Sequence, residues 1–335
     1  MAEIITVGSI CQDIFFPTNE GVTLETPEDL LSQKKIAFEL GAKYPIRQRH
    51  ESLGGNSANV AVGLAKLGEN VSVCTTVGDD MIGKWILEEL SKTGVNFELV
   101  KTERGCKSDL SAIIIDEKNS DRIIFSSHIA NKKLEFDAGK IKEPDWIFLG
   151  DLSGNWKQIT DDIVSTAKEK KIKVAFNPRQ QTIHEDVKKV ITTIADSDLI
   201  FLNKDEAMEI IGGKEGFSIP EFIQNEGYLT KTLCEIGAKV AVVTDGVRGA
   251  WVFDGTELLY AEAVLRKVID TTGAGDAFTS GFLAAYLKNK KLGDCLSWAI
   301  ANSSSSIKEY GGQLGLLDEV EIGILSKEVK VTKLA

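Results

Sequence analysis

The clearest candidate for chemistry is segment 270–278, which reads DTTGAGDAF. Gly273, Ala274 and Gly275 form a turn with almost no side chains, and an apolar run with helical spacing follows. Such a turn presents free N–H groups and the positive end of a helix dipole, which favour a phosphate. Asp276 would repel a phosphate, so it fits better as a base that takes a proton from the attacking nucleophile. A plain glycine turn with a capping Asp is the alternative.

Two more polar segments precede it. Asp13 follows the first apolar run, at the edge of an α/β sheet where ligands bind. The sequence GGNSAN at 54–59 then leads into a small-residue helix. Gly55 allows a ligand to approach the backbone closely, and Asn56 and Asn59 supply amide donors and acceptors. Taken alone, Asp13 would be a turn residue and Asn56 a helix cap.

Two segments after predicted strands have equally simple alternatives. Asn203 and Glu206 are spaced as in a capping box at the start of a helix. The segment 244–249, TDGVRG, is typical of a tight hairpin turn. Asn302 begins a run of small residues, and the glycines 311–312 follow.

In this order the segments resemble the ribokinase-like (PfkB) family of small-molecule kinases over nearly the whole chain. The resemblance implies that substrate hydroxyls are held by Asp13, Gly55 and Asn59. It implies that Asp276 is the general base and that the amides of Gly273, Ala274, Gly275 and Asp276 form an anion hole. The implied cofactors are ATP, Mg²⁺ and, as an open expectation, K⁺.

The resemblance also assigns the cofactor residues. Mg²⁺ is expected near Asn203, bound through water to Glu206. The nucleotide is expected beside Thr244, Gly246, Gly249 and Asn302. K⁺ would be held by Asp270 and the carbonyl of Thr272. The spacing from Asn302 to Gly311 is shorter than in ribokinase, which leaves the later cation ligands open.

Helix-like and strand-like runs alternate along the chain, which predicts an α/β fold with a doubly wound, mainly parallel sheet. Buried strands are expected at 4–9, 146–149, 173–177 and 199–202. We expect one domain over residues 1–335, with lid segments at about 14–53 and 106–127. Alternating residues in 110–115 and 122–127 predict a hairpin in the second segment.

Composition restricts the partners. The chain has 335 residues and a net charge of −11, which argues against nucleic acid as a partner. No apolar run approaches the ~20 residues of a membrane span. The first residues of the given sequence lead directly into a strand-like run. Five scattered cysteines suit free thiols in a reducing compartment. A cytoplasmic protein is therefore expected, and a homodimer through the lid remains open.

The substrate is the least determined feature. A small sugar is the first expectation, and a nucleoside is the main alternative, because 176–181 (FNPRQQ) is similar to a segment of some bacterial adenosine kinases. A sugar phosphate is a third, supported by the basic residues in 33–50. A non-catalytic binding protein of the same fold stays open. An oxidoreductase is disfavoured because no GxGxxG follows the first strand.

Overall fold

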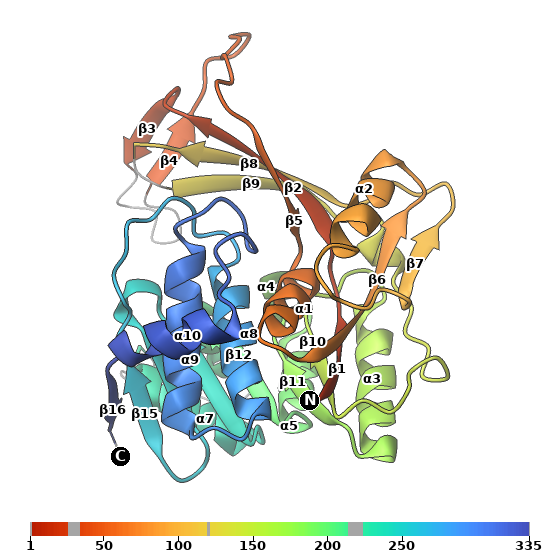
Figure 1. Ribbon diagram of the computed structural model, residues 1–335, viewed down its shortest axis with the longest axis vertical. Coiled ribbons are helices and arrows are strands. Elements are labelled where there is room, and N and C mark those ends of the chain that lie inside the picture. The colour runs from red at the N-terminus through yellow and green to blue at the C-terminus, as the bar shows by residue number, and fades with distance from the viewer. Residues whose placement is uncertain (1, 26–33, 119–120, 214–223, 335) are drawn as a thin grey trace.

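The computed structural model describes residues 2–25, 34–118, 121–213 and 224–334. Within them, ten strands form a central sheet in the order β16-β15-β14-β13-β12-β11-β10-β1-β6-β7 (Figure 1). Strand pairs from β7 to β13 are parallel, and β13 to β16 are antiparallel. The bounds are β1 Glu3–Val7, β6 Asn70–Gly78, β7 Val100–Glu103, β10 Trp146–Leu149, β11 Lys173–Phe176, β12 Leu199–Asn203, β13 Val240–Thr244, β14 Ala250–Phe253, β15 Leu258–Ala261 and β16 Val331–Lys333.

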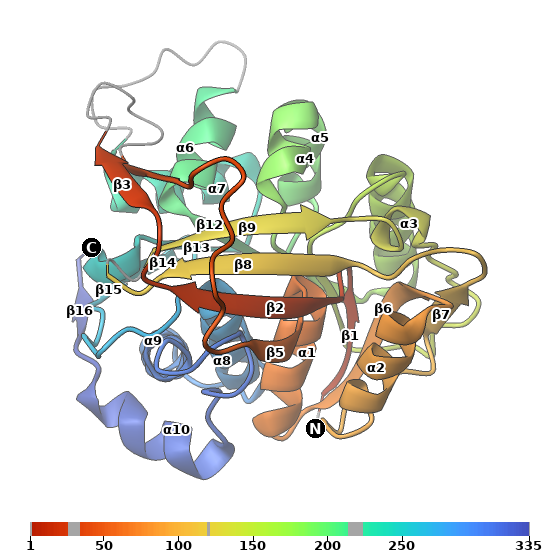
Figure 2. The same ribbon diagram turned by 90° about the horizontal axis from the view of Figure 1, so that it is seen from above.

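Helices cover both faces of this sheet, as Figure 2 shows from above. The apolar core on one face includes residues of α1, α2, α8, α9 and α10, and the core on the other includes residues of α3 to α7. The mainly parallel doubly wound sheet predicted from the sequence is therefore confirmed. The helices are α1 Asn56–Lys66, α2 Met81–Leu90, α3 Trp156–Lys170, α4 Gln180–Glu185, α5 Val187–Ala195, α6 Lys204–Gly212, α7 Glu226–Ile236, α8 Ala274–Leu287, α9 Leu292–Ser306 and α10 Glu319–Leu325.

A second sheet stands above the carboxyl ends of the parallel strands (Figure 1). Its order is β5-β2-β8-β9, with β2 Cys11–Thr18, β5 His50–Gly54, β8 Leu110–Asp116 and β9 Asp121–Ser127. The β8–β9 pair is the predicted hairpin. β3 Val22–Glu25 pairs with β4 Lys34–Ala37 beyond this sheet. Residues 26–33 and 119–120 of the expected lid segments lie outside the described residues.

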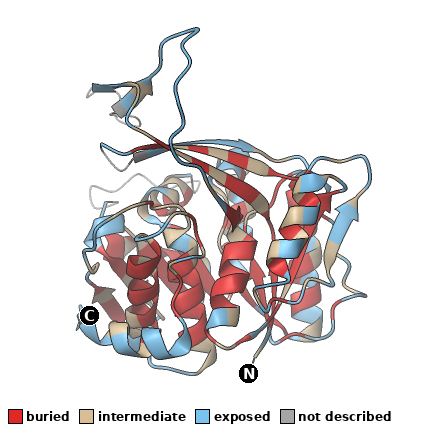
Figure 3. Cartoon of the chain, turned by 45° about the horizontal axis from the view of Figure 1, so that its top comes forward, coloured by how far each residue is buried: buried red, intermediate tan, exposed pale blue. Residues whose placement is uncertain are grey.

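Burial differs sharply between these parts. Figure 3 shows buried residues concentrated in the central sheet and its helices, whereas the β3–β4 pair and the segment leading to β5 are largely exposed. The second sheet is buried mainly where it meets the main body. Across the described ranges, we find no helix with the length and apolar character to cross a membrane.

Candidate active site

Asp276 lies in the first turn of α8, and Asn56 connects it to the segments that follow β10 and β11. The turn before the helix depends on Gly273, which has a left-handed φ of 75°. A Cβ on Gly273 would lie 2.4 Å from the Cα of Gly312, so glycine is required for shape as well as for backbone conformation. A Cβ on Gly275 would meet nothing within 4 Å. The two glycines thus differ: one is closely packed, and the other borders open space.

The amides of this turn are mostly available to a ligand. In the described structure, the N–H groups of Gly273, Gly275 and Asp276 have no hydrogen-bond acceptor. The N–H of Ala274 instead donates to the carbonyl of Thr271 at 3.3 Å. Three of the four expected donors therefore form the anion-attracting end of α8, and the fourth is used within the turn.

Two asparagines from α1 hold the carboxylate of Asp276. Asn56 Nδ2 donates to one oxygen at 2.7 Å, and Asn59 Nδ2 donates to the other at 2.8 Å. Burial raises the pKa of Asp276 to about 6, against the two amide hydrogen bonds that lower it, and Asp151 and Asp13 raise the pKa further. The group is consequently ionised near neutral pH and still basic enough to accept a proton.

Asp13 lies in β2 rather than in a loop after the first strand. It is 4% exposed, and burial raises its pKa. In the register of the second sheet, Asp13 is opposite Ser52 on one side and Ser111 on the other. This places a row of polar residues on the second sheet near Asp276.

Gly54 and Gly55 allow β2 and the segment before it to lie close to the start of α1. A Cβ on Gly54 would lie 2.0 Å from Oδ2 of Asp13. Gly55 has a φ of 94°, and a Cβ there would lie 2.6 Å from the carbonyl oxygen of Ser9. Asn59 is 3% exposed, and its Oδ1 accepts a hydrogen bond from Gln313 at 3.0 Å. The structure thus places Asp13 and Asn59 near Asp276, and Gly55 immediately precedes Asn56, which also contacts Asp276.

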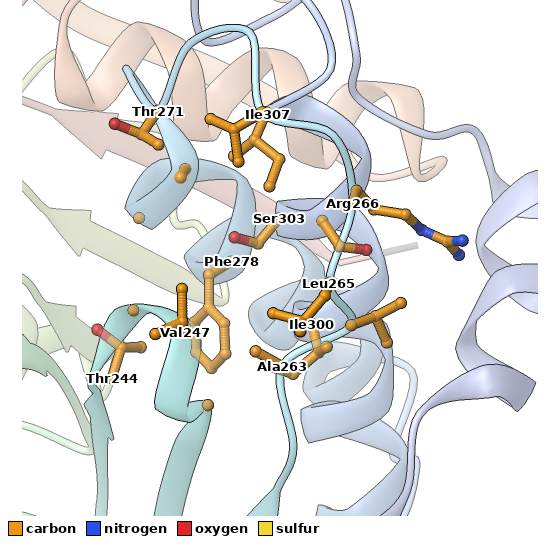
Figure 4. A pocket seen from close by; sticks show the side chains of 17 residues that line it. Thr244, Val247, Ala263, Leu265, Arg266, Thr271, Phe278, Ile300, Ser303 and Ile307 are labelled. Atoms are coloured by element: carbon orange, nitrogen blue, oxygen red, sulfur yellow. The ribbon is translucent and has the colours of Figure 1, made fainter. Parts of the chain in front are cut away.

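A cavity of about 250 Å³ opens on the other side of the α8 N-terminus (Figure 4). Val247 and Leu265 border it and are 79% and 75% exposed. Exposed apolar side chains beside a few polar groups are typical of a site for a flat organic ring. The lining includes Thr244, Gly246, Gly249, Ala263, Thr271, Ala274, Gly275, Phe278, Ile300, Ser303, Ser304 and Ile307.

Asn302, which was expected to border this cavity, is absent from its lining. The residue is fully buried, and its amide donates to the carbonyl of Ala277 and accepts from the N–H of Leu317. It links α8 to the segment before α10. The neighbouring Ser303 and Ser304 line the cavity instead.

Asn203 and Glu206 form a complete capping box at the start of α6, which was the simpler prediction for this pair. The Asn203 side chain accepts from the Glu206 N–H, and the Glu206 carboxylate accepts from the Asn203 N–H, both at 2.9 Å. Burial nevertheless raises the pKa of Glu206 to about 7. One oxygen of this carboxylate remains available for a water ligand of a metal.

Asp270 is 2% exposed, and within the described residues it pairs with no cationic side chain. Its Oδ1 accepts from the N–H and the hydroxyl of Thr272, and its Oδ2 accepts from the N–H of Gly311. Asp270, expected with Thr272 to hold K⁺, is thus hydrogen-bonded directly to the later glycine loop at 311–312. A buried carboxylate held only by neutral donors suits a nearby cation.

Sequence reasoning did not anticipate several contacts of this site. Asn56 was expected either to supply an amide or to cap the helix; the cap of α1 is Gly55, and the Asn56 side chain donates to Asp276. Asn177 contacts Asn56 from the end of β11. Arg122 of β9 reaches across and donates to Thr271 beside the anion-attracting turn. The local sequence holds no signal for these contacts, because their partners are 121 to 220 residues away.

The comparisons with known proteins agree with this geometry. A model of the pfkB family carbohydrate kinases matches residues 31–319. The chain belongs to this family. It is accordingly a kinase, a phosphotransferase with an alcohol group as acceptor.

Relatives with different named activities resemble it to similar degrees. The ribokinase of Lactococcus lactis is 29% identical and covers 99% of both chains. The ATP-dependent 6-phosphofructokinase of Thermoanaerobacterium thermosaccharolyticum is 26% identical over 84% of this chain and 87% of its own. Among solved structures, a Burkholderia thailandensis nucleoside kinase in complex with inosine aligns with a TM-score of 0.77, at 20% identity, over 97% of this chain and 98% of that one. This last likeness concerns the fold.

Proposed function

We propose that this protein transfers the γ-phosphoryl group of ATP to a hydroxyl of a small sugar or sugar-like substrate, with Asp276 as general base. The observation that carries the proposal is the position of this carboxylate. Asp276 is held by Asn56 and Asn59 at the start of a helix with three free amides. A base and an anion-binding turn in adjacent residues suit the attack of a hydroxyl on a phosphoryl group.

Each part has a defined role in the reaction. Asp276 removes the proton of the substrate hydroxyl, and the resulting oxygen attacks the γ-phosphorus. The bond from the γ-phosphorus to the bridging oxygen breaks, and ADP leaves. Gly273, Gly275 and Asp276 donate their N–H groups to the γ-phosphoryl oxygens as negative charge moves across them. Asp13, Gly55 and Asn59 hold the other substrate hydroxyls.

The cavity beside the α8 N-terminus suits the nucleotide. Val247 and Leu265, two exposed apolar residues of its lining, would contact the flat ring of the base, and Thr244, Gly246 and Gly249, which also line it, would lie near the phosphates. Asn302 then acts only indirectly, by fixing α8 and α9. Under this assignment ATP is the phosphate donor.

The cation ligands follow from the same arrangement. The described residues contain no group of three His, Cys, Asp or Glu side chains placed to hold a metal. We therefore assign Mg²⁺ to the nucleotide phosphates and water, with Glu206 and Asn203 orienting those waters. Mg²⁺ would neutralise the phosphate charge. The buried carboxylate of Asp270, with the Thr272 carbonyl, would favour K⁺.

The second sheet is proposed to act as the lid. Arg122 of β9 touches Thr271, so the hairpin already reaches the phosphate-binding turn. A closed lid would exclude water, which would otherwise compete with the substrate hydroxyl. We treat the chain as one kinase domain that includes this lid, and pairing of lids between two copies remains a proposal.

A nucleoside is the second candidate acceptor. Segment 176–181 lies beside the site, where Asn177 contacts Asn56 and Arg179 approaches Asp151. The likeness of this segment to one in adenosine kinases therefore concerns residues close to Asp276. A sugar phosphate is a weaker candidate, because the basic residues of 33–50 that the structure describes are exposed.

The test is an acceptor screen with Mg-ATP and K⁺, in which ADP release is measured. The acceptors are D-ribose, D-fructose, 2-keto-3-deoxygluconate, fructose 6-phosphate, adenosine, cytidine and inosine, and Asp276→Asn is the control. We expect one acceptor class to give ADP with the wild type and almost none with the variant. Folded protein that binds Mg-ATP but releases no acceptor-dependent ADP would contradict the proposal.

A further inference from the structure

The amide of Asn56 connects four separate segments behind the proposed base. Its Oδ1 accepts from the N–H of Asp151 at 3.0 Å. Its Nδ2 donates to Oδ1 of Asn177 at 3.1 Å and to Oδ1 of Asp276 at 2.7 Å. The segments are α1, the chain after β10, the chain after β11 and the first turn of α8. All the hydrogen-bonding capacity of this amide except one oxygen lone pair is therefore in use.

The orientation of the Asn56 side-chain amide is fixed by two backbone groups, one of which can only donate a hydrogen bond and one of which can only accept one. The backbone N–H of Asp151 can only donate, so the oxygen of Asn56 must face it. The carbonyl of Phe201 can only accept, and it takes a hydrogen bond from Nδ2 of Asn177 at 2.8 Å. Asn177 must then present its oxygen to Asn56. Both constraints direct the NH₂ group of Asn56 toward Asp276, and a flipped amide would oppose two oxygens.

The space for this amide depends on Gly150. A Cβ added at Gly150 would lie 2.1 Å from Oδ1 of Asn56. Any side chain at that position would displace the amide from its present place. The glycine at the end of β10 is thus part of the same arrangement.

The charged groups near Asp276 are mostly of its own sign. Asp13 from β2 and Asp151 after β10 both raise the pKa of Asp276. Burial raises the pKa of Asp151, against the opposing charges of Arg179, 3.5 Å away, and of His128, which lower it. In the described parts of the chain, no cationic side chain forms an ion pair with Asp276. Ionisation of Asp276 is therefore favoured by the amides of Asn56 and Asn59 and by the α8 N-terminus.

We propose that Asn56 is a positioning residue, which fixes the direction of the Asp276 carboxylate and keeps it ionised for proton transfer. This inference rests on the proposed role of Asp276 as base. Asn56 can hold the Asp276 carboxylate in one direction because its own amide is fixed by Asp151 and by the Asn177–Phe201 pair. Asn59 differs, since its second contact is the flexible side chain of Gln313.

The experiment measures the pKa of Asp276 directly, without a substrate. Protein labelled with ¹³C at aspartate carboxyls is titrated by NMR, and the signal missing in Asp276→Asn assigns the residue. In Asn56→Ala the Asp276 pKa should rise by about one unit or more, because a donor to the charged form is lost. Gly150→Ala should shift it in the same direction. Asn225→Ala removes an asparagine cap from α7, far along the chain, and serves as the matched control.

The pH dependence of activity is the second measurement. For an acceptor that is turned over in the screen, the acid limb of kcat/KM should move to higher pH in Asn56→Ala, and not in Asn225→Ala. Part of the decrease in kcat/KM of Asn56→Ala should be recovered at high pH, where Asp276 is ionised again. The part that is not recovered measures the lost orientation of the carboxylate. If Asn56→Ala does not fold, Gly150→Ala and Asn177→Ala provide the same comparison.

The outcomes separate the two proposals. An upward pKa shift confined to the Asn56, Gly150 and Asn177 variants supports the inference. An unchanged Asp276 pKa and acid limb, with Asp276→Asn inactive, would overturn the role of Asn56 and leave the base assignment intact. A fully active Asp276→Asn would overturn the base itself.

Discussion

Two carboxylates occupy the same helical position in this molecule and have different surroundings. Asp276 and Glu206 are each the third residue of a helix that begins at the carboxyl end of the central sheet. Burial raises the pKa of both, to about 6 and about 7. Glu206 is satisfied locally by the N–H of Asn203, whereas Asp276 is held by Asn56 and Asn59 from 220 and 217 residues away.

The difference separates a carboxylate that caps its own helix from one that is held by distant segments. A capping box stabilises its own helix and needs only residues three apart. The α8 turn has no side-chain cap, and its free amides are left for a ligand. The partners of Asp276 come from elsewhere in the fold, and they orient the group without serving the helix. The following predictions test this contrast, from the largest effect to the smallest.

Removing the charge of Asp276 should have the largest effect. Asp276→Asn keeps the size of the side chain but cannot accept the proton of the hydroxyl. Turnover should fall at least ~100-fold, the scale for loss of a general base. Steady-state rates with the acceptor found in the screen measure this, and calorimetry should show that Mg-ATP still binds. Near-normal turnover would contradict the assignment.

The two glycines of the turn should respond differently to alanine. Gly273→Ala places a Cβ in a left-handed backbone and against Gly312, so unfolding free energy should fall by ~1–3 kcal/mol. Turnover should also fall, by about 10-fold or more, because the amides move. Gly275→Ala meets no neighbour and should keep its stability while it raises the KM for ATP. Thermal denaturation and ATP kinetics check both, and equal destabilisation would show that Gly275 is packed too.

Glu206→Gln should affect cation use more than chemistry. Glutamine can still accept from the Asn203 N–H, so α6 should remain capped. The Mg²⁺ concentration for half-maximal activity should rise by about 10-fold, as for other residues that orient metal-bound groups. The kcat at saturating Mg²⁺ should stay close to that of the wild type. A Mg²⁺ dependence identical to that of the wild type would leave Glu206 only its capping role.

The pH dependence of the free energy of unfolding should report both carboxylates. Their folded pKa values are about 6 and about 7, above the ordinary values of 3.8 and 4.5. The folded state therefore binds more protons, and these groups make stability fall as the pH rises from about 4 to about 7. Either variant, Asp276→Asn or Glu206→Gln, should flatten this fall. Melting temperatures across the range measure it, and an unchanged slope in both variants would contradict the raised pKa values.

The fold could be predicted because its signals are local and repeated. The predicted strands at 146–149 and 173–177 correspond to β10 and β11, the second one residue too long, and the 110–115 and 122–127 runs form the β8–β9 hairpin. Such runs reflect burial on one or both faces of a sheet. The strand before Asp13 is shorter than expected, so that Asp13 lies inside β2 of the second sheet.

The site could be predicted only in part. The spacing of Gly273 to Asp276 predicted a glycine turn that opens a helix, and α8 begins there; the role of this turn in catalysis stays a prediction. Asn302 shows the limit, because neighbouring residues on a helix point about 100° apart and the cavity is lined by Ser303 instead. The contacts of Asn56 and Asn177 depend on how distant segments pack, which no local pattern records.

The most direct test of the contrast between the two carboxylates is the pH profile of kcat/KM in Glu206→Gln. Both groups titrate close to neutral pH, and Asp276→Asn is expected to be too slow to show a profile. We predict that Glu206→Gln keeps the acid limb of the wild type, near pH 6, because Asp276 is the titrating base. Loss of that limb in Glu206→Gln would contradict the account and identify Glu206 as the group that controls phosphoryl transfer.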